Sequence, residues 1–138
     1  MGTDGCASNN NLDLFQEMDS AAKLDKIFRL DPTVMPSNVV LEMATLGGAK
    51  VLGLEREIGS LEVGKKADII ILDLHRPHLQ PIYNIVSNLV YSAAGADVRD
   101  VIIDGKLVMQ DRKLLTIDEE TLLQKVEEWE AKIADSWH

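Results

Sequence analysis

The first eleven residues of the chain, MGTDGCASNNN, contain side chains that could do chemistry. Asp4 stands between Gly2 and Gly5, in a stretch too polar for a protein core. Its carboxylate could bind a metal ion or transfer a proton, which are two common roles of catalytic carboxylates. The segment also fits an ordinary turn, because Asp-Gly pairs favour turns and asparagines favour helix caps. On these residues alone, the turn is the more common explanation.

Other candidate side chains are few. His75 and His78 are three residues apart, but no third metal ligand lies near them in the sequence, so we expect two surface histidines. Cys6 has neither a histidine nor a second cysteine nearby to activate it, so we expect it to be buried under the loop. His138, the last residue, is expected to be disordered. The sequence lacks the patterns of dinucleotide sites, phosphate loops, nucleophile elbows and His-x-Glu zinc deaminases.

A helix is expected directly after the polar segment. Apolar side chains recur there with helical spacing, at Leu14, Phe15, Met18, Ala21 and Ala22. This helix should run to about Leu30 and end at Asp31-Pro32, with Asn10 or Asn11 as its N-cap. In α/β barrels, catalytic groups lie between the end of a strand and the following helix, which is where Asp4 would stand.

Two shorter helical pieces are expected next. Ser37 should cap a helix whose inward side chains are Val39, Val40, Met43 and Ala44. Gly47-Gly48 should interrupt this helix, and a last piece over residues 49–52 should end at Gly53.

Beyond residue 55 the pattern changes from helix to strand. Residues 60–63 are predicted as a short strand, followed by a turn at Gly64-Lys65. Residues 69–72 form a continuous apolar run, which is typical of a strand buried on both faces. Residues 101–109 predict a hairpin, because Asp104-Gly105 suits a type I′ turn. Residues 77–97 are expected to be connecting structure.

The end of the chain predicts one more helix. The run Thr116-Ile117-Asp118-Glu119 matches a capping box. Apolar side chains then follow with helical spacing, at Leu122, Val126, Trp129 and Ile133. We expect a terminal helix that docks through this face.

Composition limits the class of protein. The chain has 138 residues, which suits one domain or slightly more. Its 14 basic and 23 acidic residues give a formal net charge of −9, which argues against binding to nucleic acid or to anionic membranes. No apolar run is long enough to cross a bilayer or to form a secretory signal. The single cysteine suits a reducing compartment, so a cytoplasmic location is expected.

Several motifs resemble one known family. Gly2-Thr3-Asp4-Gly5, followed by Ser8-Asn9-Asn10 and Leu12-Asp13, resembles the last catalytic motif of the amidohydrolase superfamily. Residues 43–54 resemble the helix that follows this motif, residues 58–68 resemble a C-terminal signature, and residues 100–106 resemble the closing hairpin. The likeness is closest to the 5-methylthioadenosine/S-adenosylhomocysteine deaminase group, with its 5′-deoxyadenosine deaminase and triazine hydrolase relatives.

The resemblance implies an α/β fold, as the C-terminal fragment of a metal-dependent hydrolase (β/α)₈ barrel. Residues 1–56 would hold the loop of the last strand and the following helices of the barrel domain. Residues 57–138 would form the C-terminal share of a composite β-sandwich and a terminal helix. Because a barrel needs roughly 200 residues or more, we expect the C-terminal third of a longer enzyme, inactive alone.

The resemblance also implies a site and a reaction. Asp4 matches the aspartate that ends strand 8 of the barrel. It would therefore bind a divalent metal, for which zinc is expected, and it would also contact the substrate. The other metal ligands are missing from this chain. Asp4 would accept a proton from the attacking water and pass it to the departing amine, while Ser8 and Asn9 support the loop.

The implied substrates are adenine nucleosides such as 5-methylthioadenosine, S-adenosylhomocysteine or 5′-deoxyadenosine, deaminated by hydrolysis with release of ammonia. The implied partners are this purine nucleoside and the rest of the chain's own catalytic barrel, with a homo-oligomer left open. Two alternatives remain: a fragment of a triazine or guanine hydrolase, and a non-catalytic, stand-alone interaction module. The residues that discriminate between substrates in such enzymes lie upstream. This sequence therefore does not separate the adenine nucleoside deaminase from the triazine or guanine hydrolase.

Overall fold

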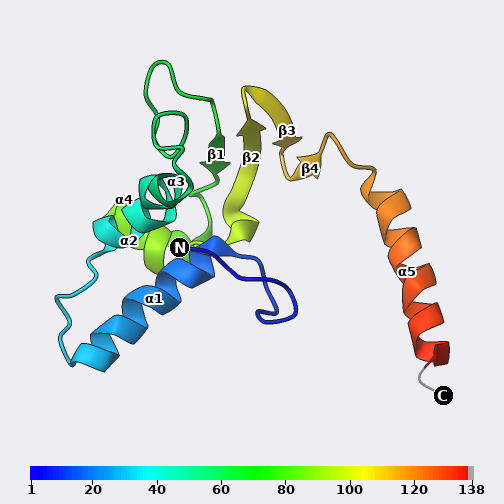
Figure 1. The fold of residues 1–138 in the computed structure, drawn as a ribbon, viewed down its shortest axis with the longest axis horizontal. Coiled ribbons are helices and arrows are strands. Elements are labelled where there is room, and N and C mark those ends of the chain that lie inside the picture. The colour runs from blue at the N-terminus through cyan, green and yellow to red at the C-terminus, as the bar shows by residue number, and fades with distance from the viewer. Residues whose placement is uncertain (137–138) are drawn as a thin grey trace.

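The computed structural model describes residues 1–136, and the expectation for His138 lies outside the described residues. A group of helices packs beside a small sheet, and a last helix stands apart from both (Figure 1). The helices and strands are α1 Leu14–Arg29, α2 Ser37–Ala44, α3 Leu46–Leu52, β1 Ile69–Leu72, α4 Ile85–Tyr91, β2 Val98–Ile103, β3 Lys106–Gln110, β4 Lys113–Leu114 and α5 Glu119–Ser136. Two 3₁₀ turns, Pro77–Leu79 and Gly95–Asp97, fall within the segment expected to be connecting structure.

The core lies among α1, α2 and α4. Met18 and Ala22 of α1 pack with Val40 of α2 and Val90 of α4, and all four side chains are buried. These α1 and α2 residues belong to the apolar faces predicted from spacing. Helix α1 is therefore confirmed in its extent and its buried face.

The predicted cap of α1 is wrong. Asp13, rather than Asn10 or Asn11, is the N-cap, and its Oδ1 accepts a hydrogen bond from the Phe15 N–H at 2.9 Å. A capping side chain must stand directly before the first helical residue to reach the free N–H groups. Asn11 lies two residues before the position of the cap, and its Oδ1 accepts from the Asp13 N–H instead.

The break between α2 and α3 also differs from the prediction. Ser37 is the first residue of α2 and caps nothing, because Pro36 is the N-cap. The helix breaks at Thr45, whose backbone leaves the helical region, and Gly47 and Gly48 lie inside α3. A Cβ at Gly47 would stand 3.1 Å from the Glu42 carbonyl oxygen, so this glycine permits a close approach of the two helices.

The C-terminal end of α3 and the hairpin agree with the prediction, although α3 begins at Leu46 rather than at residue 49. Gly53 ends α3 with a left-handed backbone at φ 70°. The hairpin joins β2 and β3, with φ of 50° at Asp104 and 75° at Gly105, as a type I′ turn requires. These features depend on local chemistry that the sequence displays directly.

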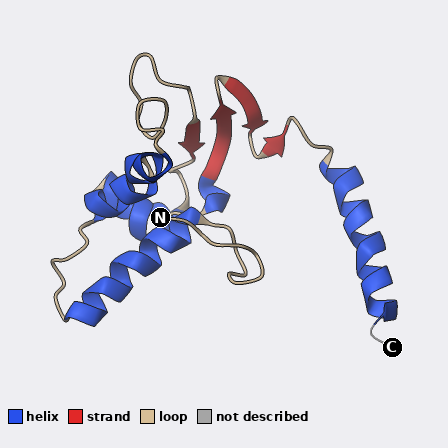
Figure 2. Cartoon of the chain, viewed as in Figure 1, coloured by secondary structure: helices blue, strands red, loops and turns tan. Residues whose placement is uncertain are grey.

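Residues 60–63 do not form the predicted strand, whereas residues 69–72 form theirs without the predicted burial. Residues 60–63 are irregular, and the Ser60 hydroxyl donates to the Glu62 carboxylate within that segment. The sheet is antiparallel, in the order β1-β2-β3-β4, so β1 is an edge strand (Figure 2). Ile70 and Ile71 of β1 are 48% and 38% exposed rather than buried on both faces, because the rest of residues 1–136 covers these side chains only in part.

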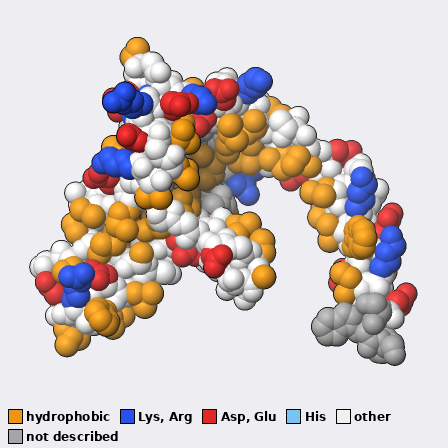
Figure 3. Space-filling view, viewed as in Figure 1, with side chains coloured by type: hydrophobic (Ala, Val, Ile, Leu, Met, Phe, Trp, Pro, Cys, Tyr) orange, Lys and Arg blue, Asp and Glu red, His pale blue; other side chains and the backbone are white. Residues whose placement is uncertain are grey.

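Helix α5 forms as predicted but does not dock on the rest of the described chain. It begins after Asp118, which accepts from the Thr121 N–H at 3.2 Å and the Thr121 hydroxyl at 2.6 Å, so Thr116 is not the cap. Its apolar face is visible along the helix in Figure 3, and its side chains at Leu122, Val126, Trp129 and Ile133 are 47 to 62% exposed. Within residues 1–136, no helix is long and apolar enough to cross a membrane.

Candidate functional site

Asp4 lies in an exposed loop that precedes α1. Its backbone is left-handed, with φ 59°, a conformation that aspartate tolerates better than most residues. Its Oδ1 accepts a hydrogen bond from the Gly5 N–H at 2.7 Å. Within the described residues no group donates to Oδ2, so one oxygen of this exposed carboxylate stays available for a ligand.

The loop is closed by its own backbone and held by one amide side chain. The N–H groups of Ser8 and Asn9 both donate to the Gly5 carbonyl at 2.9 Å. The half-buried Asn9 Nδ2 donates to the Thr3 carbonyl at 3.0 Å and to Glu17 Oε1 of α1 at 2.6 Å. Ser8 is exposed, and the structure gives its hydroxyl no hydrogen bond among residues 1–136. Asn9 is therefore the loop residue whose side chain reaches both the Asp4 region and α1.

A long-range hydrogen bond joins the start of α1 to the turn that precedes β2. The Asp13 Oδ2 accepts from the Gly95 N–H at 2.9 Å, across 82 residues of sequence. Arg112 Nη1 donates to the Gly95 carbonyl at 3.0 Å and to the Val98 carbonyl at 2.9 Å. Asp13 thus fixes both the first turn of α1 and the turn that leads into β2. Sequence reasoning missed this role, since no local pattern connects Asp13 to Gly95.

Cys6 is exposed, so the prediction of a buried cysteine is wrong. It lies in the outer part of the loop, where Gly5, Ala7 and Ser8 are exposed as well. No element of the described chain covers this turn.

Both histidines lie at the surface, as predicted. His75 is exposed, and the side chain of His78 is 52% exposed. His78 Nε2 lies 3.0 Å from the Oδ2 of Asp97, which is buried and also accepts from the Ala94 N–H. Burial raises the pKa of Asp97, but the hydrogen bonds from His78 and Ala94 together lower it by more. The net shift of this pKa is therefore downward. Residues 1–136 contain no group of three or more metal-ligating side chains.

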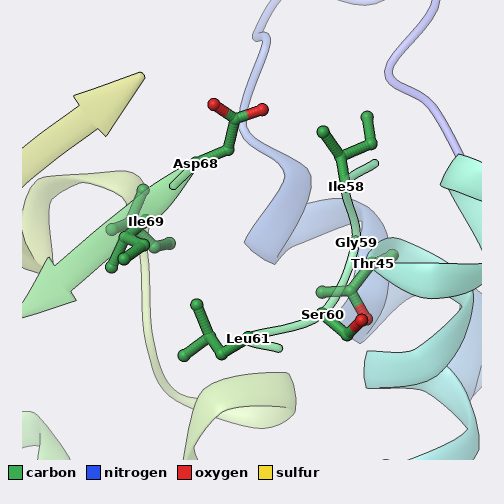
Figure 4. A pocket seen from close by; sticks show the side chains of 9 residues that line it. Thr45, Ile58, Gly59, Ser60, Leu61, Asp68 and Ile69 are labelled. Atoms are coloured by element: carbon green, nitrogen blue, oxygen red, sulfur yellow. The ribbon is translucent and has the colours of Figure 1, made fainter. Parts of the chain in front are cut away.

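A mainly apolar pocket lies between the α2–α3 junction and the start of β1 (Figure 4). Its lining residues are Ala44, Thr45, Ile58, Gly59, Ser60, Leu61, Asp68, Ile69 and Ile70. The polar groups there are already engaged: the Thr45 hydroxyl donates to the Leu41 carbonyl, and Asp68 accepts from the Asp104 N–H at 2.7 Å. The pocket does not include Asp4 and offers no reactive group.

Gly59 explains why the segment at this pocket is so close to α3. Its φ is 89°, and a Cβ there would stand 2.8 Å from the Ala49 Cβ and 2.9 Å from the Leu46 Cα. Only glycine permits both this backbone and this approach.

The chain belongs to the amidohydrolase family, whose model matches residues 1–108. It is 57% identical over 136 residues to a 5-methylthioadenosine/S-adenosylhomocysteine deaminase 1 of Syntrophus aciditrophicus (strain SB), covering 99% of this chain and 31% of that protein. It is 52% identical over 127 residues to a 5′-deoxyadenosine deaminase of Methanosarcina mazei, covering 92% of this chain and 29% of that protein. The chain thus spans about a third of the length of the curated relatives it matches.

Solved structures agree with the predicted fold class. An adenosine deaminase from Xanthomonas campestris, solved with bound zinc, matches with a TM-score of 0.90 and 41% identity, over 95% of this chain and 30% of that one. An atrazine chlorohydrolase from Arthrobacter aurescens matches with a TM-score of 0.81 and 22% identity, over 90% and 28%. At that identity the second likeness speaks to the fold alone. The predicted family and the C-terminal α/β fragment are confirmed.

Proposed function

We propose that this chain is the C-terminal part of a metal-dependent amidohydrolase that removes the amino group of adenine nucleosides by hydrolysis and releases ammonia. The substrate class is that of the relatives, namely 5-methylthioadenosine, S-adenosylhomocysteine or 5′-deoxyadenosine. The observation that carries the proposal is the Asp4 loop, tied at its base and presenting an exposed carboxylate, in a chain 57% identical to a named deaminase.

The donor set of Asp4 fits a divalent metal. Carboxylate oxygens are ordinary zinc ligands, and Oδ2 of Asp4 is exposed and not engaged within residues 1–136. Oδ1 is held by the Gly5 N–H, which orients the carboxylate as a hydrogen bond to a ligating group commonly does. We assign zinc, in line with the bound zinc of the Xanthomonas campestris enzyme. The other ligands would come from outside the described residues.

Asp4 would serve three purposes in the reaction. A bound divalent metal supplies the Lewis acidity that makes water reactive near neutral pH. Asp4 holds the metal, accepts the proton of the attacking water at its carboxylate, and returns that proton to the amine as it leaves the adenine ring at C6. A carboxylate that is exposed to the substrate on one side and fixed on the other suits this transfer.

The proposal includes the surroundings of Asp4. Asn9 holds the loop through the Thr3 carbonyl, and Ser8 supports the turn through its backbone N–H. Residues 1–56 would belong to the end of the catalytic barrel domain, and residues 57–138 to the C-terminal share of the β-sandwich. The chain would act with the rest of its own barrel, in the cytoplasm, and would be inactive alone. The triazine hydrolase alternative has only a likeness of fold to support it.

A hybrid enzyme tests the proposal. In it, this chain replaces the matching 136-residue stretch of the Syntrophus aciditrophicus protein. We expect the hybrid enzyme to bind zinc and to release ammonia from 5-methylthioadenosine or S-adenosylhomocysteine. Asp4→Asn should lower kcat by about 10²- to 10⁴-fold, the usual contribution of a proton-transfer group, and should weaken zinc binding.

The matched control is Asp135→Asn, which changes an exposed aspartate on α5. It should leave kcat within about twofold of the unmodified hybrid enzyme, since surface substitutions away from a site have small effects. The proposal fails if the hybrid enzyme folds and binds zinc but releases no ammonia, or if Asp4→Asn behaves like Asp135→Asn.

A further inference from the structure

We propose that Glu17 is a positioning residue for the Asp4 carboxylate, acting through Asn9. Glu17 lies in the first turn of α1, and its Oε1 accepts the Asn9 Nδ2 hydrogen bond at 2.6 Å. The structure gives Glu17 no hydrogen bond to Asp4, and Glu17 belongs to no motif that sequence reasoning singled out. The inference rests on the proposed function, because it names how the same site is held.

The hydrogen bonds of Asn9 leave it one orientation. Its Nδ2 carries two hydrogens and donates one to the Thr3 carbonyl at 3.0 Å and the other to Glu17. Both partners can only accept at these atoms, so the amide nitrogen, rather than the amide oxygen, must face them. Asn9 and Glu17 thus form a clamp, here called the Asn9–Glu17 clamp, with both amide hydrogens used.

The clamp acts on the peptide bond directly before Asp4. The carbonyl that Asn9 holds is that of Thr3, so the Thr3–Asp4 peptide plane is fixed relative to α1. Asp4 keeps a left-handed backbone at φ 59°, which aspartate tolerates, and the direction of its side chain depends on how the preceding peptide is held. If the peptide plane were free to rotate, the carboxylate would swing with it.

The charge of Glu17 strengthens the clamp. Hydrogen bonds to an ionised carboxylate are shorter and about twice as strong as neutral ones, and the 2.6 Å distance is shorter than that of an ordinary N–H···O bond. A glutamate in the first turn also favours the helix by itself, through the helix dipole. A test must therefore separate a role in positioning from a role in helix stability.

The adjacent residue supplies the control for that separation. Gln16 Oε1 accepts from Asn11 Nδ2 at 2.6 Å, which is another bond between the loop and the first turn of α1. Asn11 makes no hydrogen bond to Thr3 or Asp4 in the described chain. Gln16→Leu therefore removes a loop-to-helix bond without releasing the peptide before Asp4.

The experiment compares Glu17→Leu, Glu17→Gln and Gln16→Leu in the hybrid enzyme. We expect Glu17→Leu to weaken zinc binding, measured by competition with a chelator, and to lower kcat, each by about 10- to 100-fold, the usual effect of losing a group that orients a metal ligand. Glu17→Gln keeps an oxygen acceptor and should restore both values to within about threefold. Gln16→Leu should leave both values unchanged, although it lowers the melting temperature by removing its own bond between the loop and the helix.

The outcomes separate this inference from the proposed function. Zinc binding and kcat of Glu17→Leu equal to those of Gln16→Leu would overturn the positioning role, while Asp4→Asn still tests the function. A loss in Glu17→Leu that Glu17→Gln does not restore would also contradict it, because the acceptor oxygen would then not be the cause. If Asp4→Asn binds zinc as tightly as the unmodified hybrid enzyme, the proposed function fails, and the positioning role fails with it.

Discussion

Helices α1 and α5 have the same kind of amphipathic spacing but different surroundings. In α1, Met18 and Ala22 are 3% and 0% exposed, because α2 and α4 pack over them. In α5, the side chains at the equivalent spacing are all about half exposed, and the helix stands away from the sheet (Figure 1). Spacing therefore predicts a helix and its apolar face, but it does not predict what covers that face.

The caps of the two helices show the same difference. Both begin after an aspartate that accepts a backbone N–H of its own helix. The second oxygen of Asp13 binds Gly95, 82 residues away, whereas the second oxygen of Asp118 binds Thr121 within α5. The first cap contributes to the tertiary structure, and the second stabilises only its helix.

The largest difference is expected for truncations of the two apolar faces. Met18→Ala should lower the free energy of unfolding by about 2–5 kcal/mol, because it leaves a cavity in the core. Trp129→Ala should change it by less than about 0.5 kcal/mol, since the ring is 62% exposed and lies under the exposed Lys132 side chain. Urea unfolding of the 138-residue chain measures both values. A large effect of Trp129→Ala would show that α5 is covered in solution.

Two glycines extend the comparison to the segment over α3. Gly59→Ala should cost about 2–4 kcal/mol, because it adds a clash with α3 to the left-handed backbone. Gly64 has a similar φ of 95°, but a Cβ added there would meet no atom within 4 Å. Gly64→Ala should therefore cost only about 1–2 kcal/mol. Thermal unfolding of the two variants compares them. Equal losses would mean that the segment does not pack on α3.

The buried carboxylate of Asp97 predicts a pH dependence of the global free energy of unfolding. Its pKa lies below the ordinary 3.8, so its contribution to stability is complete above pH 3.8 and is lost as the pH falls through its lower value in the folded state. Asp97→Asn should lower the free energy of unfolding at pH 7 by about 1.5–3 kcal/mol. It should also reduce the acid-induced loss of stability, measured by unfolding between pH 5 and pH 2.

That reduction should be partial. Asp31, Glu62, Asp100 and Asp118 also have lowered pKa values, so they titrate in the same direction. An unchanged pH dependence in Asp97→Asn would contradict the role of the His78 and Ala94 hydrogen bonds.

The smallest effect on stability is expected from removing the two capping side chains, Asp13 and Asp118. Asp13→Ala should cost about 1–2 kcal/mol of global stability, because the N–H groups of Phe15 and Gly95 both lose their hydrogen-bond acceptor. Asp118→Ala should leave global stability within about 0.5 kcal/mol. It should instead lower the helical content of α5, measured by circular dichroism or by amide exchange at Thr121. A global loss equal to that of Asp13→Ala would remove the distinction between the two caps.

The sequence predicts features that depend on neighbouring residues and fails for those that depend on distant ones. The extent of α1, the end of α3 at Gly53 and the Asp104-Gly105 turn follow from local spacing and glycine chemistry. The burial of β1 was predicted wrongly, because an apolar strand does not reveal whether it lies at the edge of a sheet. The cap of α1 was misplaced by two or three residues, because several polar residues in a row could each serve.

The same limit applies to the candidate site. Asp4 stands out by its type, its flanking glycines and the family motif, and Asn9 follows from that motif. Glu17 was missed because its contact with Asn9 requires the loop to fold back on α1. A glutamate eight residues after a loop asparagine has no distinctive spacing. Helix geometry could place Glu17 in the first turn, but not facing the loop.

The left-handed backbone at Asp4 restricts what evolution can place there. Glycine, asparagine and aspartate adopt φ near 59° at little cost, whereas β-branched and bulky residues do so with strain. Of these three residues, only aspartate carries a charge that can hold a cation. The conformation of the loop thus narrows the choice of amino acid before any selection on catalysis, and asparagine is the neutral replacement that leaves the main chain undisturbed.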